Sequence, residues 1–237
     1  MTEWLYMTDS YVRSFEARVV ERGEFGVVLD RSAFYPRGGG QPSDHGVLIE
    51  ADGREYKVED LKRDGERVWH ILPGRDRPAV GEALRGEIDW ERRHRLMRTH
   101  TALHILSGVI FRDWGAQVTG GNMEPGEGRL DFELEVFSKD DLPDLEEKLN
   151  AEVAADRPIV VKILPREEAF RIPDLIRTKV NLIPEHVQEI RTVDIVGLDL
   201  QADGGTHVAS TAEVGRIRVV GYKSKGKDNK RVRIELD

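Results

Sequence analysis

The sequence contains no cysteine. This absence excludes a disulfide framework, and it also excludes any metal site that depends on a thiolate ligand. No run of apolar residues approaches the roughly 18 that a membrane-spanning helix needs, so we expect no contact with a membrane. The N-terminus carries an acidic residue and lacks the basic-then-apolar order of a signal peptide. Together these absences favour a cytoplasmic protein.

An excess of positive charge is also missing. The 237 residues carry a formal net charge of −8, which argues against a protein that coats nucleic acid indiscriminately. The stretch 215–237 is nevertheless dense in lysine and arginine, so local affinity for phosphate is compatible with the acidic total. Apolar residues make up 39% of the chain and charged residues 34%, which is typical of a folded protein that buries a core.

The first part of the chain has the pattern of short strands joined by tight turns. In residues 14–34 apolar residues alternate on both sides of a glycine-flanked turn, which predicts a hairpin. Residues 55–72 repeat the pattern around Asp64-Gly65, a strong hairpin dipeptide. Residues 82–90 predict one further strand. Several short strands of this kind indicate a small β-barrel or a sandwich.

The spacing of apolar residues changes after Trp90, from the alternation of strands to the period of a helix. Residues 91–115 have the spacing of a helix that Gly115 ends, and 138–156 predict a second helix with acidic residues and a proline in its first turn. Residues 158–164 and 215–222 are strand-like. We therefore predict an α+β protein with a small N-terminal β-barrel domain (1–88) and an α+β domain (89–237).

Two histidines four residues apart lie within the first predicted helix. His100 and His104 would occupy one face, where two imidazoles can reach one metal ion. Taken alone, two histidines at this spacing more often lie on a helix surface or pack in a partly buried position than bind a metal. The helix is largely apolar, however, and buried neutral histidines without partners are costly. Ser107 and Gly108, on the histidine side, leave room for further ligands.

A second segment offers those ligands. In "QADGGTHV" (201–208), Asp203 and His207 flank a glycine-containing turn, which places an oxygen ligand and a nitrogen ligand close together. The alternative is an ordinary turn that Asp203 caps and in which His207 is incidental. The other four histidines of the chain show no partner pattern; they are His45, His70, His94 and His186.

Four motifs in a fixed order carry a resemblance to a known family. They are "FYPRGGGQPSDHG" (34–46), "IDWERRHRLMRTHTALHIL" (88–106), "GRLDFEL" (128–134) and "GGTHV" (204–208). They resemble the editing domains of alanyl-tRNA synthetases and the free-standing AlaX proteins, and the medium-length AlaX type is the nearest. The resemblance implies an N-terminal barrel with a glycine-rich motif, followed by an editing domain with one Zn²⁺ ion. A chain of this length has no room for an aminoacylation domain and shows no P-loop, so we expect no use of ATP.

The resemblance also implies an activity, the hydrolysis of mischarged alanine tRNA. The target would be Ser-tRNA(Ala), with Gly-tRNA(Ala) as a second substrate, because an alanine pocket rejects both amino acids poorly. The family's histidines correspond to His100, His104 and His207, whereas Asp203 stands where the family usually has cysteine. Asp203 either ligates the metal or acts on a water molecule, and it permits a harder metal than zinc.

A site that spares alanine needs a polar group for the hydroxyl of serine, and the candidates for it are Thr99, Thr101, Gln201 and Thr206. Besides Asp203, we expect Thr99 and Gln201 as catalytic candidates. The candidates for substrate binding are Arg37, Gly38, Gly39, Gly40, Asp44, Thr101 and Thr206. For the glycine-rich motif, the alternative is a purely structural turn of the barrel.

The basic C-terminal stretch has two interpretations. It is either a solvated hairpin tip or a guide for the acceptor end of tRNA(Ala). The residues concerned are Lys223, Lys225, Lys227, Lys230 and Arg231. The sequence leaves three other functions open: a tRNA-binding module with a structural metal, an editing domain for threonine tRNA, and an unrelated metallohydrolase of small substrates.

Overall fold

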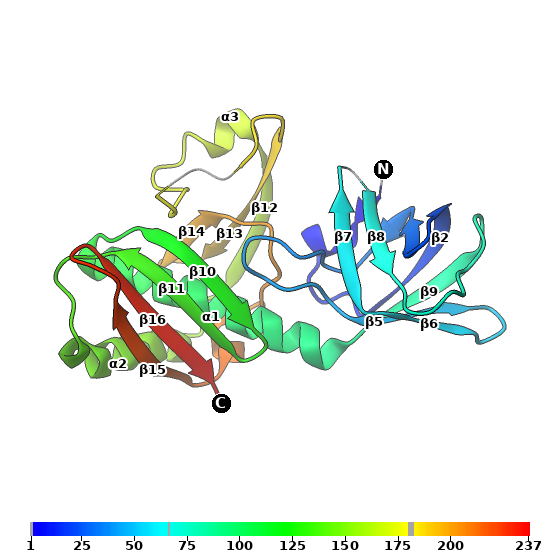
Figure 1. The fold of residues 1–237 in the computed structure, drawn as a ribbon. Coiled ribbons are helices and arrows are strands. Elements are labelled where there is room, and N and C mark those ends of the chain that lie inside the picture. The colour runs from blue at the N-terminus through cyan, green and yellow to red at the C-terminus, as the bar shows by residue number, and fades with distance from the viewer. Residues whose placement is uncertain (1, 66, 180–182) are drawn as a thin grey trace. The chain divides into compact units, whose positions relative to one another are not determined.

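The computed structural model describes residues 2–65, 67–179 and 183–237. The chain folds into two compact units, Met1–Arg95 and Leu96–Asp237. Strands predominate in both units and helices are few, in agreement with a mixed α and β class (Figure 1). The boundary predicted at residue 88 lies at the end of a strand, and the helix that follows it, Trp90–Trp114, contributes residues to both units.

The first unit consists mainly of strands. In chain order its elements are β1 (Glu3–Trp4), η1 (Leu5–Met7), β2 (Ser14–Arg22), β3 (Gly26–Leu29), β4 (Arg31–Ser32), β5 (Gly46–Glu50), β6 (Glu55–Val58), β7 (Asp60–Asp64), β8 (Arg67–Ile71) and β9 (Ala83–Ile88).

Both predicted hairpins of the first unit are confirmed. Strands β2 and β3 pair in antiparallel fashion across the turn at Gly23–Gly26, and β7 pairs with β8 across the turn that contains Gly65. Gly65 has a φ of 58°, the left-handed conformation that glycine adopts without strain. The predicted strand at 82–90 is β9. Local turn chemistry and alternation were therefore sufficient to locate these elements.

The predicted closed barrel is not confirmed. Seven strands pair in the order β6-β5-β9-β2-β3-β8-β7, so β6 and β7 are the two edges of an open sheet within the described residues. Strand β2 explains the form of this sheet. Its residues 14–18 pair with β9, and the pairing with β3 begins only at Val19, beside a register shift. Each neighbour thus covers only half of β2, and alternation within single strands does not reveal such an offset.

The second unit combines two sheets with two longer helices. Its elements are α1 (Trp90–Trp114, shared with the first unit), β10 (Val118–Glu124), β11 (Glu127–Glu133), η2 (Lys139–Asp141), α2 (Leu142–Ala154), β12 (Ile159–Pro165), α3 (Arg166–Ala169), β13 (Glu189–Ile195), β14 (Asp199–Ala202), η3 (Thr211–Val214), β15 (Ile217–Ser224) and β16 (Asn229–Leu236).

The two predicted helices are present, and their ends have local causes. Asp89 caps the start of α1 by accepting the backbone N–H of Arg92. Gly115, with a φ of 66°, ends it. Before α2, Ser138 and Asp141 form a capping box, and a proline occupies the first turn of α2. The second helix therefore begins as a short 3₁₀ segment that continues into α2.

Helix α1 is the buried centre of the second unit. The four-stranded sheet, in the order β10-β11-β16-β15, covers α1 and α2 (Figure 1). Gly128 of β11 lies so close to Leu103 that a Cβ at this position would be 3.0 Å from that side chain. The turn between β13 and β14, in the three-stranded sheet β12-β13-β14, packs against the same helix at Gly108. Two separate sheets thus approach one helix.

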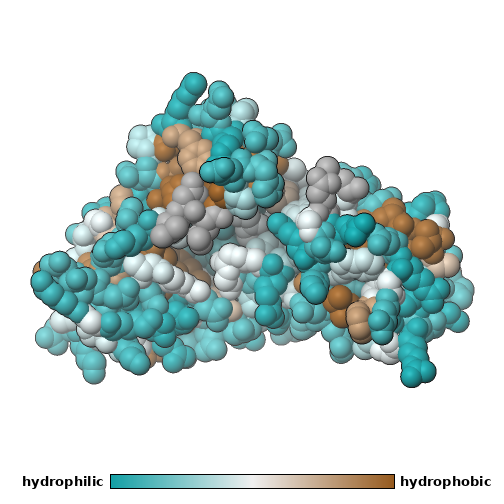
Figure 2. Space-filling view, turned by 45° about the horizontal axis from the view of Figure 1, so that its top comes forward, coloured by the Kyte–Doolittle hydropathy of each residue, from teal (hydrophilic) through white to brown (hydrophobic). Residues whose placement is uncertain are grey.

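The surface is consistent with the charge-rich sequence. Hydrophilic residues predominate on the face of the molecule that Figure 2 shows. None of the helices within the described residues combines the length and the apolar composition that crossing a membrane requires.

Candidate metal centre

Helix α1 positions the first two histidines. His100 and His104 lie one turn apart, and both are buried, with 6% and 7% of their surfaces exposed. Their ring centroids are 5.0 Å apart and the rings are nearly perpendicular. The helix around them is buried because apolar residues occupy most of its circumference, so the imidazoles face the interior of the unit and not solvent.

The loop after β14 brings in the other two side chains. Asp203 accepts the backbone N–H of Gly205 at 2.7 Å through Oδ2, which closes the turn. The same oxygen lies 3.1 Å from Nε2 of His207. His207 is buried, and its ring stacks on that of His100 with a centroid distance of 4.3 Å. Two segments about a hundred residues apart therefore meet at one point.

The four side chains form one compact cluster. One potential ligand atom from each of His100, His104, Asp203 and His207 lies within 4.8 Å of the others. Nε2 of His100 is 3.6 Å from Oδ1 of Asp203. Three imidazole nitrogens and one carboxylate oxygen are a donor set that suits zinc and other divalent transition metals. The residues present thus fit a metal ion.

Contacts behind the cluster orient two of the histidines. Nδ1 of His104 lies 3.1 Å from Oδ2 of the buried Asp199, and Nδ1 of His207 lies 3.1 Å from Oγ1 of Thr101. Because these bonds engage Nδ1, Nε2 is the nitrogen that each ring has left for the cluster. The sequence analysis did not identify Asp199. Its only local signal was alternation of acidic and apolar residues in "DIVGLDLQAD", which is common in hairpins.

The electrostatics of the cluster suit a cation. Burial lowers the pKa of His100 to about 4, so this imidazole is neutral at neutral pH. Burial also lowers the pKa of His207 well below its ordinary value. For His104, burial is outweighed by the hydrogen bond to Asp199 and the charge of Asp203, and the pKa is raised. Burial alone would raise the pKa of Asp203, but the surrounding histidines lower it well below its usual range.

One arginine contacts Asp203 from outside the cluster. Arg191 of β13 is 4% exposed, and its Nη1 donates to the backbone carbonyl of Asp203 at 3.0 Å. The same nitrogen lies 3.7 Å from Oδ2 of that residue. Arg191 therefore holds both the backbone and the carboxylate of Asp203.

The other predicted residues of this segment have different surroundings. Thr99 is fully buried and accepts the N–H of Gly126, at the turn between β10 and β11. Thr101 is also fully buried, behind His207. Gln201 is half-buried and donates through Nε2 to Asp199 at 2.7 Å and to Ser107 at 3.2 Å. Thr206 is fully buried within the loop of Asp203. Their roles toward a substrate stay predictions.

The glycine-rich motif forms a tight turn in the first unit. Gly38 and Gln41 exchange both backbone hydrogen bonds, at 3.1 and 2.9 Å. Gly39 and Gly40 between them have φ values of 56° and 88°. Positive φ at both central residues is the requirement of a type I′ turn, and glycine meets it without strain. Gly39, Gly40 and Arg37 are exposed, so the tip of this turn is available for contacts.

Asp44 supports the base of the same turn. Its Oδ2 accepts the N–H of Tyr35 at 2.6 Å. Asp44 also forms an ion pair with Arg93 of α1, and both side chains are fully buried. Arg93 donates further to the carbonyl groups of Ser10 and Ala33. A direct contact of Asp44 with a substrate would require this ion pair to open.

The basic C-terminal residues are not equivalent. Lys230 is 6% exposed, and its ammonium group donates to Ser224 Oγ and to the carbonyls of Gly226 and Lys227. It therefore closes the hairpin between β15 and β16. Lys225 and Arg231 both bind Asp131 of β11. The exposed side chains of Lys223 and Lys227 agree with a solvated hairpin tip.

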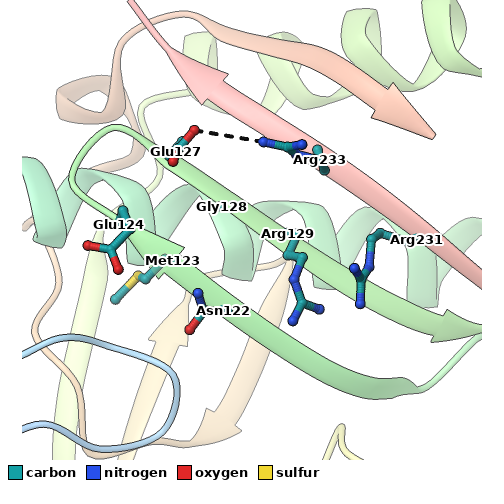
Figure 3. Close-up of a pocket in the computed structure, with 8 residues that line it drawn as sticks. All are labelled: Asn122, Met123, Glu124, Glu127, Gly128, Arg129, Arg231 and Arg233. Carbon is teal, nitrogen blue, oxygen red and sulfur yellow. Dashed lines mark ion pairs between the residues drawn. The ribbon is translucent and has the colours of Figure 1, made fainter. Parts of the chain in front are cut away.

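A shallow hollow of about 240 Å³ lies on the outer face of the four-stranded sheet. Figure 3 shows that Arg129 and Arg231, on the neighbouring strands β11 and β16, border it. Arg233 stands directly opposite Arg129 in the register and pairs with Glu127. The sequence analysis did not single out Arg129 or Arg233, because the pairing of β11 with β16 brings them together.

Two family models each match part of the chain. A model described as "tRNA synthetases class II (A)" matches residues 7–92. A model described as "Threonyl and Alanyl tRNA synthetase second additional domain" matches residues 190–233, the segment that carries Asp203 and His207. The second description covers both the threonine and the alanine systems, so it does not distinguish between them.

Full-length relatives make that distinction. An alanyl-tRNA editing protein AlaX-M of Saccharolobus solfataricus is 40% identical over 98% of this chain and 98% of its own length. Another from Methanosarcina barkeri is 38% identical over 100% of this chain and 99% of its own. An alanine–tRNA ligase of Pyrobaculum neutrophilum is 40% identical over 92% of this chain, but over only 25% of the ligase. The chain therefore belongs to the AlaX-M family of alanyl-tRNA editing proteins.

Proposed function

We propose that this protein is a trans-editing hydrolase that removes the wrong amino acid from alanine tRNA. The substrate we propose is Ser-tRNA(Ala), with Gly-tRNA(Ala) as the second candidate. The observation that carries the proposal is the buried cluster of His100, His104, Asp203 and His207, in a chain that matches alanyl-tRNA editing proteins over their whole length. Hydrolysis of an ester needs no ATP, and a tRNA substrate is consistent with the expected cytoplasmic location.

We propose one zinc ion for the cluster. The three histidines and Asp203 would hold it, and the neutral state of the buried His100 leaves a lone pair for the metal. Bound zinc would supply positive charge for an ester carbonyl or a water molecule. A carboxylate and a thiolate each carry one negative charge, so Asp203 gives the proposed site the same charge that a cysteine would give it. The hydrogen bond from Gly205 to Oδ2 leaves Oδ1 of Asp203 as the oxygen for ligation.

Among the predicted candidates, the surroundings favour Gln201 as the residue that recognises serine. Its Nε2 already donates to Asp199 and Ser107, so its carbonyl oxygen is the group that can accept the hydroxyl of a seryl ester. An alanyl ester would leave that acceptor unpaired, at a cost of about 1–3 kcal/mol. Thr99 and Thr101 use their hydroxyl groups inside the protein, which makes them weaker candidates.

The tRNA contacts that we propose involve exposed groups of both units. Arg37 and the glycines 38–40 form an exposed turn whose charge and bare backbone suit a phosphate or an ester. In the second unit, the exposed Lys223, Lys225 and Lys227 can reach phosphate, whereas Lys230 closes its own hairpin. Arg231 is half-buried, and it would have to leave Asp131 to contact a phosphate. Positive charge confined to such patches agrees with a protein that binds the acceptor end of one tRNA.

One alternative has support in the geometry. Four ligands that already lie within 4.8 Å of one another could also saturate a metal ion, as structural zinc sites do. The protein would then bind tRNA without hydrolysing the ester.

The deciding experiment is deacylation of seryl-tRNA(Ala) and alanyl-tRNA(Ala) by the purified chain. It would be run as isolated, after chelation and after addition of zinc. We expect loss of serine that chelation abolishes and zinc restores, with alanine retained. Zinc binding and tRNA capture without loss of serine would overturn the proposal in favour of the structural alternative.

A further inference from the structure

Asp199 is a buried carboxylate next to the candidate metal centre. It begins β14, and its side chain is completely inaccessible to solvent. Oδ2 lies 3.1 Å from Nδ1 of His104 and accepts Nε2 of Gln201 at 2.7 Å. Oδ1 accepts Nε of Arg177 at 3.4 Å. A carboxylate in such a place is costly to bury unless partners compensate it, so each of these contacts matters for its orientation.

From these contacts we propose that Asp199 is a positioning residue for the metal centre. By accepting the N–H of His104 Nδ1, it holds the imidazole in the tautomer whose lone pair is on Nε2, and it sets the plane of the ring. The negative charge of Asp199 also makes Nε2 of that imidazole more basic, and therefore a better ligand for a metal ion. This inference rests on the proposed metal site. It adds to the four proposed ligands a residue that lies behind one of them and does not itself bind the metal.

The approach of the β13–β14 turn to helix α1 makes the contact possible. Gly108 lies one helical turn after His104. A Cβ at this position would be 2.9 Å from Cγ of Leu198 and 3.0 Å from Cβ of Asp199. The absence of a side chain at Gly108 therefore lets Asp199 come within hydrogen-bond distance of the helix. Ser107 adds a third connection by accepting Nε2 of Gln201 at 3.2 Å.

Arg177 holds Asp199 from the other side. Its guanidinium lies 3.6 Å above the ring of Phe111 on α1, which fixes the plane of the group. The side chain of Arg177 is only 11% exposed, so its charge is poorly screened where it meets Asp199. A positive partner on Oδ1 compensates the burial of the carboxylate while Oδ2 remains directed at His104.

His207 offers an internal comparison. Its Nδ1 has a neutral hydroxyl partner, Thr101, whereas Nδ1 of His104 has a carboxylate. A charged acceptor forms the stronger hydrogen bond. We therefore expect removal of the charge at Asp199 to weaken metal binding more than loss of the hydroxyl at Thr101.

The test is zinc affinity of the full chain, measured by competition with a chromophoric chelator. Asp199→Asn should raise the Kd for zinc by ~10–100-fold. The matched control is Asp194→Asn. This residue lies on the same hairpin, directly opposite Leu200 in the register, and the charges that affect it are those of Lys162 and, more weakly, Asp199. It should leave the Kd unchanged.

A spectroscopic measurement separates positioning from general support of the fold. In zinc-loaded protein, the Nδ1–H proton of His104 should resonate far downfield and exchange slowly, because it donates to a carboxylate. In Asp199→Asn the signal should move upfield and exchange faster, and Asp194→Asn should not affect it. If Asp199→Asn does not fold, Gln201→Ala removes one bond to the same oxygen at a half-buried position and should shift the same resonance.

Three results would overturn the inference. They are an unchanged zinc Kd in folded Asp199→Asn, a His104 resonance that neither Asp199→Asn nor Gln201→Ala alters, and the absence of zinc binding by the parent chain. The proposed function fails differently. A chain that binds zinc in an Asp199-dependent manner but leaves seryl-tRNA(Ala) intact would overturn the hydrolase and support the positioning role. A chain that deacylates, with zinc affinity indifferent to Asp199, would overturn only the positioning role.

Discussion

Oδ2 of Asp203 lies 3.1 Å from Nε2 of His207 and accepts the backbone N–H of Gly205 as well. One carboxylate oxygen thus joins the geometry of the loop to the donor set of the cluster. The motif resemblance implies that Asp203 stands at a position where a cysteine is usual. Because a carboxylate extends one atom further than a thiolate and has a second oxygen, Asp203 can shape the loop and still present Oδ1 to a metal.

We expect Asp203→Ala to abolish stable zinc binding, because it removes the negative ligand and the acceptor for Gly205 together. Asp203→Cys should retain zinc, since it restores a single negative charge and a ligand of higher affinity for this metal. The zinc content of protein dialysed against chelator would measure both effects. Equal zinc retention by Asp203→Ala and the parent chain would exclude Asp203 as a ligand.

The buried ion pair of Asp44 and Arg93 should contribute strongly to stability. Asp44→Asn leaves the charge of Arg93 buried without its partner, so we expect a loss of about 3–5 kcal/mol in the free energy of unfolding. Urea denaturation would measure it. The control is Glu3→Gln, which breaks the exposed pair with Arg31 and should have little effect. Similar losses in the two variants would show that burial does not determine the contribution.

His70 should make stability depend on pH. Burial lowers its pKa from 6.5 to about 4, while Ser32 and the carbonyl of Val27 bond its ring nitrogens. Between these pH values the unfolded chain binds a proton that the folded chain does not. The contribution is therefore fully present above pH 6.5, and up to about 3 kcal/mol is lost as the pH falls to 4.

The variant His70→Gln separates this contribution from those of the other histidines. Urea unfolding at pH 7 and pH 4.5 should show a smaller decrease in stability for the variant than for the parent chain. The same decrease in both proteins would mean that His70 does not titrate as its burial predicts.

Lysines of the C-terminal hairpin should separate into two classes. Lys230→Met removes three hydrogen bonds from a buried ammonium group, and we expect a loss of about 1–3 kcal/mol in stability. The exposed Lys223 should matter for tRNA instead. Lys223→Ala should weaken binding and reduce the slope of log K against log salt by about 1 if that side chain contacts a phosphate.

Thermal unfolding and tRNA filter binding at several salt concentrations would distinguish the two lysines. Lys223→Ala should leave the unfolding temperature unchanged. If Lys223→Ala bound tRNA with the parent affinity and salt slope, the hairpin would be only a solvated tip.

Local features of the fold were predictable because local forces determine them. Gly65 and Gly115 have positive φ, Asp89 caps α1, and Ser138 begins a capping box, so turns and helix ends follow from a few neighbouring residues. The spacing of His100 and His104 on one helical face follows in the same way. The pairing of strands does not follow from neighbouring residues. For this reason the sequence did not predict that β6 and β7 are the two ends of the strand order in this sheet.

The hairpins, the two helices, the absence of thiolate ligands and four side chains of the right chemistry for one metal ion were all predictable from the sequence alone. Their meeting at one point is a result of the three-dimensional fold, because it depends on packing of the loop at 203–208 against a helix about a hundred residues earlier. The same packing determines which side chains lie behind the four. Asp199 reaches His104 because Gly108 allows the close approach of a hairpin. Contacts between segments so far apart in the chain leave no periodic pattern in the sequence from which they could be predicted.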